Sequence, residues 1–142
     1  MSKPAPKHVV PMLAVDSVDA IRMFYVERLG FEHKMGVVGK DGQLDFCTVV
    51  LGGARLMFMR PRDSAPAPGP SRTKQPVEIY LEVADVEDHH DRLEKAGVTI
   101  ADPLKTQWWG DRTFKVMDPY GYQIWFYQTV AEMKPPEGVK VV

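Results

Sequence analysis

The feature that most constrains the fold is an internal repeat that relates the first half of the chain to the second. Residues of the same kind recur 68 positions apart, in the pairs Val15/Val83, Val18/Val86, Gly42/Gly110, Phe46/Phe114, Gly53/Gly121 and Phe58/Phe126. Gly30 and Gly97 are one position closer together. Glycines and aromatic residues rarely coincide in this way by chance, so we expect a duplicated structural module.

Each half has the pattern of a strand, a helix and three further strands. In the first half an apolar run at 8–15 leads to a helix start at Asp16-Ser17, and Gly30 ends that helix. In the second half the run 77–83 leads to a helix start at Asp85, and Gly97 ends the helix. Further strand-like runs lie at 31–38, 44–51, 54–59, 98–101, 112–117 and 122–127. The predicted fold class is α+β, with two tandem βαβββ modules that form curved mixed sheets.

Proline placement divides the chain. Five of its twelve prolines lie between Pro61 and Pro76, which predicts a surface connection at 61–76 between a first module at 8–60 and a second at 77–129. Residues 130–142, with two adjacent prolines, are expected to form a tail.

Charge and composition exclude several classes of function. Eighteen basic and nineteen acidic residues give a net charge of −1 without charged runs, so neither nucleic acid nor a membrane surface is an expected partner. The single cysteine, Cys47, has no internal disulfide partner and is expected to be a buried, inert thiol. No apolar run matches a signal peptide or a membrane span, so a cytoplasmic location is expected.

Strand alternation separates an aliphatic face from a mixed face. Along 77–83 the aliphatic residues alternate with Glu78, Tyr80 and Glu82, and along 122–127 the mixed face carries Gln123, Trp125 and Tyr127. Methionines at 57 and 59 take the same place in the first module. Such a face is either an ordinary interface between sheets or subunits, or the wall of a cup-shaped cavity for a small organic molecule.

Two motifs carry a resemblance to a known family. Phe24-Tyr25 followed by Leu29-Gly30-Phe31, and the later segment Asp118-Pro119-Tyr120-Gly121, resemble signatures of the vicinal oxygen chelate superfamily. That superfamily holds glyoxalase I, extradiol dioxygenases, fosfomycin-resistance enzymes and bleomycin-resistance binding proteins. The resemblance implies the two-module fold over about 8–128 but does not fix the activity, because one scaffold hosts many chemistries.

The resemblance also implies where a metal would bind. The ligand positions of the metal-dependent members correspond to Val10, Met57, Glu78 and Trp125, and only Glu78 can ligate a divalent cation. We therefore expect no metal and no cofactor. The alternative is a metal-dependent lyase or dioxygenase with a displaced site around His8 and Glu78. His89 and His90 are adjacent on the predicted helix, which favours helix packing over a two-histidine clamp.

The sequence hypothesis is a metal-free, bleomycin-resistance-like homodimer that binds a small aromatic or amphipathic molecule. Trp108 and Trp109 either cover a sheet edge or subunit contact, or offer a stacking surface at the mouth of the cup. A third possibility is a structural or stress-related dimer whose cup is filled by its own side chains. The expected ligand-binding residues, with Glu78 and Glu82 as acidic anchors, are Met57, Met59, Glu78, Tyr80, Glu82, Trp108, Trp109, Trp125 and Tyr127.

Overall fold

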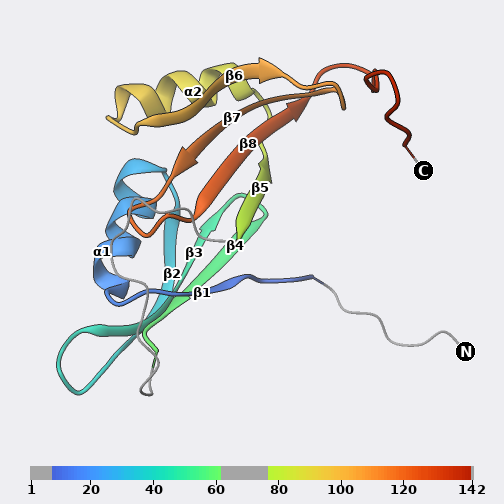
Figure 1. Ribbon diagram of the computed structural model, residues 1–142. Helices are drawn as coiled ribbons and strands as arrows, with labels where there is room; N and C mark the ends of the chain where they lie inside the picture. Colours follow the sequence, from blue (N-terminus) through green and yellow to red (C-terminus); the bar gives the residue numbers. More distant parts are fainter. Residues whose placement is uncertain (1–7, 62–76, 142) are drawn as a thin grey trace, which may run out of the picture. The chain divides into compact units, whose positions relative to one another are not determined.

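The computed structural model describes residues 8–61 and 77–141, so most of the predicted connection at 61–76 lies outside the described residues. The chain divides into two compact units, Met1–Gly69 and Pro70–Val142, called here the N-terminal and C-terminal units (Figure 1). None of the helices in the described part is long and apolar enough to cross a membrane.

The N-terminal unit is a four-stranded mixed sheet with one helical segment. Its elements are β1 (Met12–Ala14), α1 (Val18–Met23), the π-helical turn η1 (Phe24–Arg28), β2 (Glu32–Val38), β3 (Leu44–Leu51) and β4 (Ala54–Met59). The strand order is β1-β4-β3-β2, and only the β1–β4 pairing is parallel.

The C-terminal unit repeats this arrangement. Its elements are β5 (Glu78–Glu82), α2 (Val86–Lys95), β6 (Ile100–Thr106), β7 (Asp111–Met117) and β8 (Gln123–Thr129). The strand order is β5-β8-β7-β6, again with a parallel pairing between the first and last strands. The predicted α+β class and two-module βαβββ architecture are confirmed.

The strand register shows where the internal repeat holds. Met12 pairs with Met57 in the first sheet and Tyr80 pairs with Trp125 in the second, at the predicted spacing of 68. The predicted Phe46/Phe114 equivalence is wrong. Phe114 pairs with Phe126, whereas Phe58 pairs with Cys47. The spacing is 67 throughout β3 and β7, and it returns to 68 because five residues separate the paired Met117 and Gln123, whereas four separate the paired Val50 and Arg55.

The helices begin at the predicted caps and end at the predicted glycines. Ser17 accepts a hydrogen bond from the amide of Ala20, and Asp85 accepts one from that of Asp88. Gly30 and Gly97 have φ of 80° and 83°, a left-handed conformation that favours glycine. The first helix passes into the π-helical turn, which takes up one extra residue. This accounts for the spacing of 67 between the two glycines.

The helix of the C-terminal unit covers one face of its sheet. The His89 ring is buried 4.6 Å from the Phe126 ring, and His90 meets Phe114 edge to face at 5.1 Å. The prediction that both histidines pack the helix is therefore confirmed. Cys47 is also buried, as predicted, and burial raises the pKa of its thiol to about 11.

Two predicted strands have the wrong extent. The run 8–15 forms only the short strand β1, and His8 is exposed ahead of it. The run 98–101 continues as β6 to Thr106, through Pro103. Pro103 is accommodated because β6 is an edge strand with a register shift between Asp102 and Lys105, where a missing N–H costs little.

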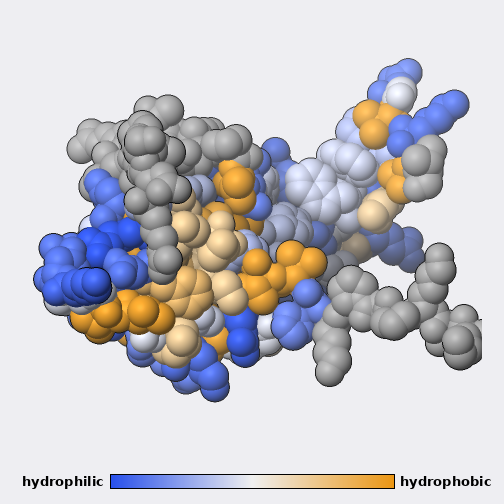
Figure 2. Space-filling model, turned by 90° about the horizontal axis from the view of Figure 1, so that it is seen from below, coloured by the Kyte–Doolittle hydropathy of each residue, from blue (hydrophilic) through white to orange (hydrophobic). Residues whose placement is uncertain are grey.

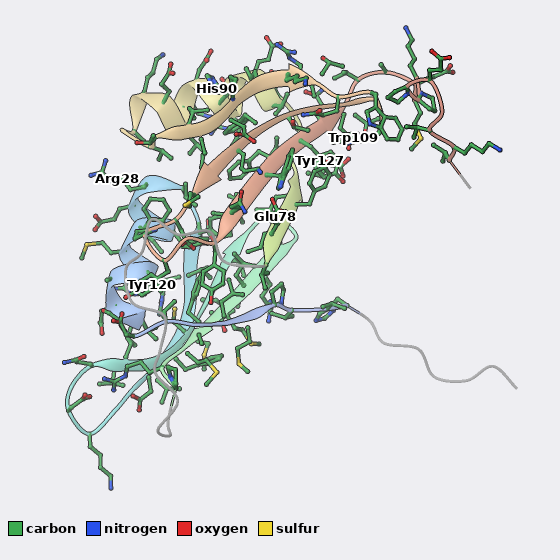
Figure 3. All side chains as sticks on the ribbon, viewed as in Figure 1. Arg28, Glu78, His90, Trp109, Tyr120 and Tyr127 are labelled. Carbon is green, nitrogen blue, oxygen red and sulfur yellow. The ribbon has the colours of Figure 1, made fainter. Side chains whose placement is uncertain are left out.

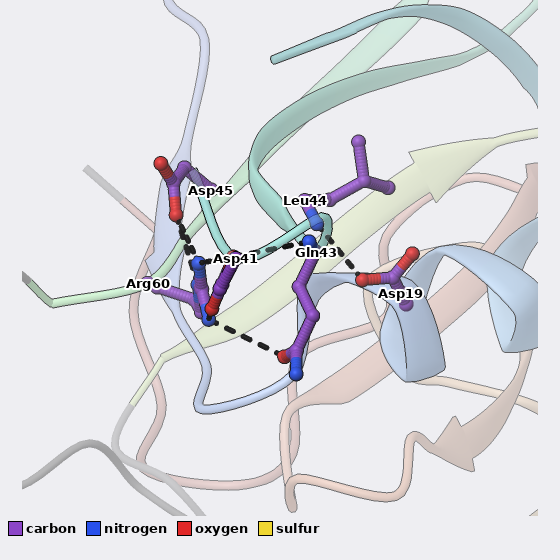
Figure 4. A network of polar contacts seen from close by, with 6 residues as sticks. All are labelled: Asp19, Asp41, Gln43, Leu44, Asp45 and Arg60. Carbon is purple, nitrogen blue, oxygen red and sulfur yellow. Dashed lines mark hydrogen bonds and ion pairs between the residues drawn. The ribbon is translucent and has the colours of Figure 1, made fainter. Parts of the chain in front are cut away.

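A polar network fixes the hairpin between β2 and β3 (Figure 4). The Arg60 guanidinium donates to Asp41 Oδ2 at 2.9 Å and also to Asp45, which joins the end of β4 to the turn and to β3. The amide of Leu44 donates to Asp19 Oδ2 at 2.9 Å, which ties α1 to the start of β3. These contacts hold the turn against the helical layer of the N-terminal unit.

Candidate functional site

Alternation along β5, β7 and β8 builds a polar and aromatic face on the C-terminal sheet, opposite α2. Phe114 and Phe126 point to the helix, and their neighbours point to the other side. Across the strands Tyr80 pairs with Trp125, and Trp125 pairs with Lys115. Glu78, Tyr127 and Trp109 follow one another along this side of the unit in Figure 3.

Three aromatic rings form the centre of this face, called here the aromatic face and defined by Tyr80, Trp125 and Tyr127. Tyr80 and Tyr127 are stacked, with ring centroids 4.3 Å apart and an interplanar angle of 21°. Trp125 lies 5.7 Å from Tyr80. Tyr80 is 43% exposed, and the other two are partly exposed, so a planar molecule has ring surface to contact.

The Tyr80 hydroxyl is held in a chain of hydrogen bonds. It donates to Asp111 Oδ2 at 2.7 Å and accepts from Trp109 Nε1 at 2.9 Å. The Thr129 hydroxyl donates to the other Asp111 oxygen at 2.7 Å. Burial, with a smaller contribution from Asp111, raises the pKa of Tyr80 to about 12, although the Trp109 bond lowers it. Tyr80 is therefore a neutral phenol in a fixed orientation.

A second group surrounds Lys115, whose side chain is 9% exposed. Its ammonium donates to Gln123 Oε1 at 3.0 Å and forms ion pairs with Glu78 at 3.2 Å and Asp102 at 3.4 Å. It also lies 4.2 Å from the centroid of the Trp125 ring, in a cation–π contact. The Lys115 ammonium is therefore held by one amide oxygen, two carboxylates and an indole ring.

The residues at the family's ligand positions do not fit a divalent metal. Glu78 Oε1 accepts the Trp125 indole N–H at 2.9 Å and lies against Lys115, so an ammonium already balances the one carboxylate available there. Met57 offers only a thioether, which is a soft ligand, and Val10 and Trp125 offer none. His8, invoked for a displaced site, is exposed in the N-terminal unit.

The structure brings together five of the expected ligand-binding residues. Glu78, Tyr80, Trp109, Trp125 and Tyr127 are joined by the ring contacts and hydrogen bonds above.

The other two expected residues of the C-terminal unit lie beside this group. Trp108 is 37% exposed and meets the Trp109 ring edge to face at 5.6 Å. Glu82 is exposed, and after burial its charge is the next cause of the raised pKa of Tyr127. Trp109, rather than Trp108, thus bonds to the aromatic face.

Met57 and Met59 belong to the corresponding face of the N-terminal sheet. That face is apolar: the partly exposed Met57 pairs with Met12, and exposed side chains of β1 and β2 extend the row. The large apolar residues exposed on β1 and β2 are Met12, Met35, Val37 and Val38. Figure 2 shows apolar surface, in orange, at the lower left and centre of the view from below and in smaller separate spots at the upper right.

Sequence reasoning missed Asp111, Lys115 and Thr129. The signal was present, because Asp111, Thr113 and Lys115 alternate with Phe114 and Val116 in the same way as the residues of β5 and β8. When the same alternation is applied to β7, its polar residues Asp111, Thr113 and Lys115 fall on the aromatic face.

One further group on the surface has atoms suited to a metal. His90, Asp91 and Glu94 of α2 bring one ligand atom each within 4.8 Å of the others, and His90 Nδ1 lies 3.1 Å from Asp91 Oδ1. Asp91 and Glu94 are exposed. Exposed acidic side chains are common on helices, and we assign no function to this group.

Comparison with known proteins identifies the family. The family model described as the Glyoxalase/Bleomycin resistance protein/Dioxygenase superfamily matches residues 6–126. The chain belongs to this superfamily. The uncharacterized protein Mb0911c of Mycobacterium bovis is 33% identical over 134 residues, which cover 89% of this chain and 86% of that protein.

Solved structures of this superfamily share the fold. TioX from Micromonospora sp. ML1 is 26% identical with a TM-score of 0.69, over 88% of this chain and 100% of that one. TnmS3, an antibiotic binding protein from Streptomyces sp. CB03234, is 28% identical with a TM-score of 0.64, over 89% and 99% of the two chains. A protein described as antibiotic-binding is thus among the structural neighbours.

Proposed function

We propose that this superfamily member binds a small aromatic or amphipathic molecule on the aromatic face, without a metal. The observation that carries the proposal is the partly exposed stack of Tyr80 and Tyr127 beside Trp125. Aromatic rings that already have ordered polar partners present apolar surface without further reorganisation, which favours stacking of a planar ligand.

The polar groups around the rings support a binding role over an inert interface. Asp111 and Lys115 are buried, and both have hydrogen-bonding partners that fix the rings in place. A binding site typically combines apolar walls with a few fixed polar groups of this kind. The resemblance to an antibiotic-binding structure at 28% identity agrees with a planar organic ligand such as an antibiotic.

The assembly and location are proposed on separate grounds. The apolar face of the N-terminal sheet, with Met12 and Met35 about half exposed, supports a homodimer, because a monomer seldom leaves a large apolar area in water. The single buried cysteine supports the cytoplasm as its location.

The test is isothermal titration with acridine, a planar aromatic probe, in mildly alkaline buffer where it is uncharged. Tyr127→Ala removes one ring of the stack and should weaken binding by about 0.5–1.5 kcal/mol or more, roughly two- to tenfold. Met23→Ala, at an exposed residue of α1, is the control and should bind as the wild type does. Absence of binding to acridine, or equal effects of the two substitutions, would contradict the proposal.

A further inference from the structure

We propose that the aromatic face selects an organic cation, an aromatic molecule carrying a protonated or quaternary amine, and that Asp111 together with Glu82 provides the selectivity. This inference rests on the proposed function, because it specifies the ligand class of the same site. Asp111 was not among the residues expected from sequence, and of the two expected acidic anchors, Glu78 and Glu82, this inference assigns the selectivity to Glu82.

The charges of the face are unbalanced. Four carboxylates, those of Glu78, Glu82, Asp102 and Asp111, accompany two ammonium groups, those of Lys115 and of the exposed Lys105, which pairs with Thr113. Lys115 contacts Glu78 and Asp102 and donates to an amide oxygen. Its charge is therefore committed to one side of the Trp125 ring, away from the hydrogen bonds of Asp111.

Asp111 is a buried carboxylate without a cationic partner. It is 9% exposed, and both of its oxygens accept hydrogen bonds from neutral hydroxyls, those of Tyr80 and Thr129. Within the described residues it forms no ion pair. Hydroxyl donors orient a carboxylate but leave its negative charge uncompensated, and low exposure reduces the screening of that charge by water.

The rings next to Asp111 favour a cation as well. The negative faces of Tyr80, Tyr127 and Trp109 attract an ammonium or a charged heteroaromatic ring, and the attraction grows when the cation is desolvated. Glu82 pairs with Tyr127 across β5 and β8, and Tyr127 stacks on Tyr80, whose hydroxyl donates to Asp111, so two carboxylates lie near these rings. An aromatic surface with carboxylates on this side fits an organic cation better than a neutral or anionic molecule of the same shape.

Glu78 contributes to orientation rather than to this selectivity. Its carboxylate accepts the indole N–H of Trp125 and is paired with Lys115, so its charge is balanced within the protein. The same holds for Asp102, which is paired with Lys115 on the neighbouring strand. Asp102 therefore offers a matched control: an acidic residue of the same face whose charge already has a partner.

The experiment compares two probes of nearly identical shape, acridine and N-methylacridinium, by isothermal titration in mildly alkaline buffer. The first probe is neutral under these conditions and the second carries a permanent positive charge. Wild-type protein should bind N-methylacridinium about tenfold more tightly or better. Asp111→Asn keeps an acceptor for Tyr80 but removes the charge. It should reduce the ratio of the two affinities to about threefold or less, because N-methylacridinium loses more affinity than acridine.

The controls separate this inference from the proposed function. Asp102→Asn should leave the ratio of affinities as in wild type. If neither probe binds, the proposed function fails and this inference with it. If both probes bind wild-type protein equally, or the ratio is unchanged in folded Asp111→Asn, the inference is overturned while the proposed function stands.

A second pair of measurements applies if Asp111→Asn does not fold. Glu82→Gln, at an exposed residue, should lower the same ratio, and raising the salt concentration should lower it in the wild type because salt screens the carboxylates. A ratio that is insensitive both to Glu82→Gln and to salt would overturn the assignment.

Discussion

Replacing Lys115 with methionine tests whether the buried ammonium organises the aromatic face. The substitution keeps the length of the apolar stem but removes the charge and every N–H donor. It leaves Gln123, which is 5% exposed, with an unsatisfied amide oxygen, at a cost of about 1–3 kcal/mol. Loss of the cation–π contact with Trp125 adds about 0.5–2 kcal/mol.

Two further terms of opposite sign enter the net effect. The ion pairs with Glu78 and Asp102 join Lys115 to partners that are 47% and 57% exposed, so each contributes at most about 1 kcal/mol. Methionine also carries no cost for the desolvation of a buried ammonium, so part of the lost free energy of unfolding is recovered. We expect Lys115→Met to lower the free energy of unfolding by about 2–3 kcal/mol.

The assay is urea denaturation followed by tryptophan fluorescence and far-UV circular dichroism. A double variant, Lys115→Met with Gln123→Leu, removes both hydrogen-bonding partners and should recover more than 1 kcal/mol relative to Lys115→Met alone. A free energy of unfolding within about 0.5 kcal/mol of wild type for Lys115→Met would refute the reasoning. So would strictly additive losses in the double variant, because they would show that the two side chains are not coupled.

Three other predictions concern acid sensitivity, the hairpin and metals. Burial lowers the pKa of His89 below its ordinary 6.5, so the folded state loses stability as pH falls below about 6.5. His89→Phe keeps a ring against Phe126 and should remove that loss in thermal melts recorded at several pH values. A melting temperature that depends on pH in the same way in the variant and the wild type would disprove the cause. Arg60→Gln should speed amide hydrogen exchange in the β2–β3 turn around Asp41 while α2 stays protected, and uniform acceleration would contradict a local role. Divalent zinc, nickel or manganese should change the melting temperature by less than about a degree, whereas a shift of several degrees that disappears in Glu78→Ala would reveal a metal site.

The elements of the fold were predictable because they depend on local pattern. The caps Ser17 and Asp85 and the glycines at 30 and 97 act within a few residues, and β3 and β4 have the predicted bounds. The extents of β1 and β6 were not predictable in this way, because a strand also needs a hydrogen-bonding neighbour. The displaced equivalence of Phe46 likewise depends on pairing, because the turn between β7 and β8 is one residue longer than the turn between β3 and β4.

The candidate site was predictable only in part. Alternation in β5 and β8 identified Tyr80, Trp125 and Tyr127 as residues of one face, and the structure confirms that they lie together. The partners of these rings depend on the register between strands, which alternation within one strand does not give. For that reason the roles of Lys115 and Asp111 emerged only from the structure.

The central claim, that the aromatic face binds a planar molecule, is tested most directly by following the three tryptophan indole N–H signals in a nitrogen–proton NMR spectrum during titration with acridine. Trp109 donates to Tyr80 and Trp125 donates to Glu78, so both indole signals report on this face. We expect both to shift in a saturable way with one dissociation constant, and Tyr127→Ala to raise that constant. If the signals of Trp109 and Trp125 stay in place up to the solubility limit of acridine, the account is wrong.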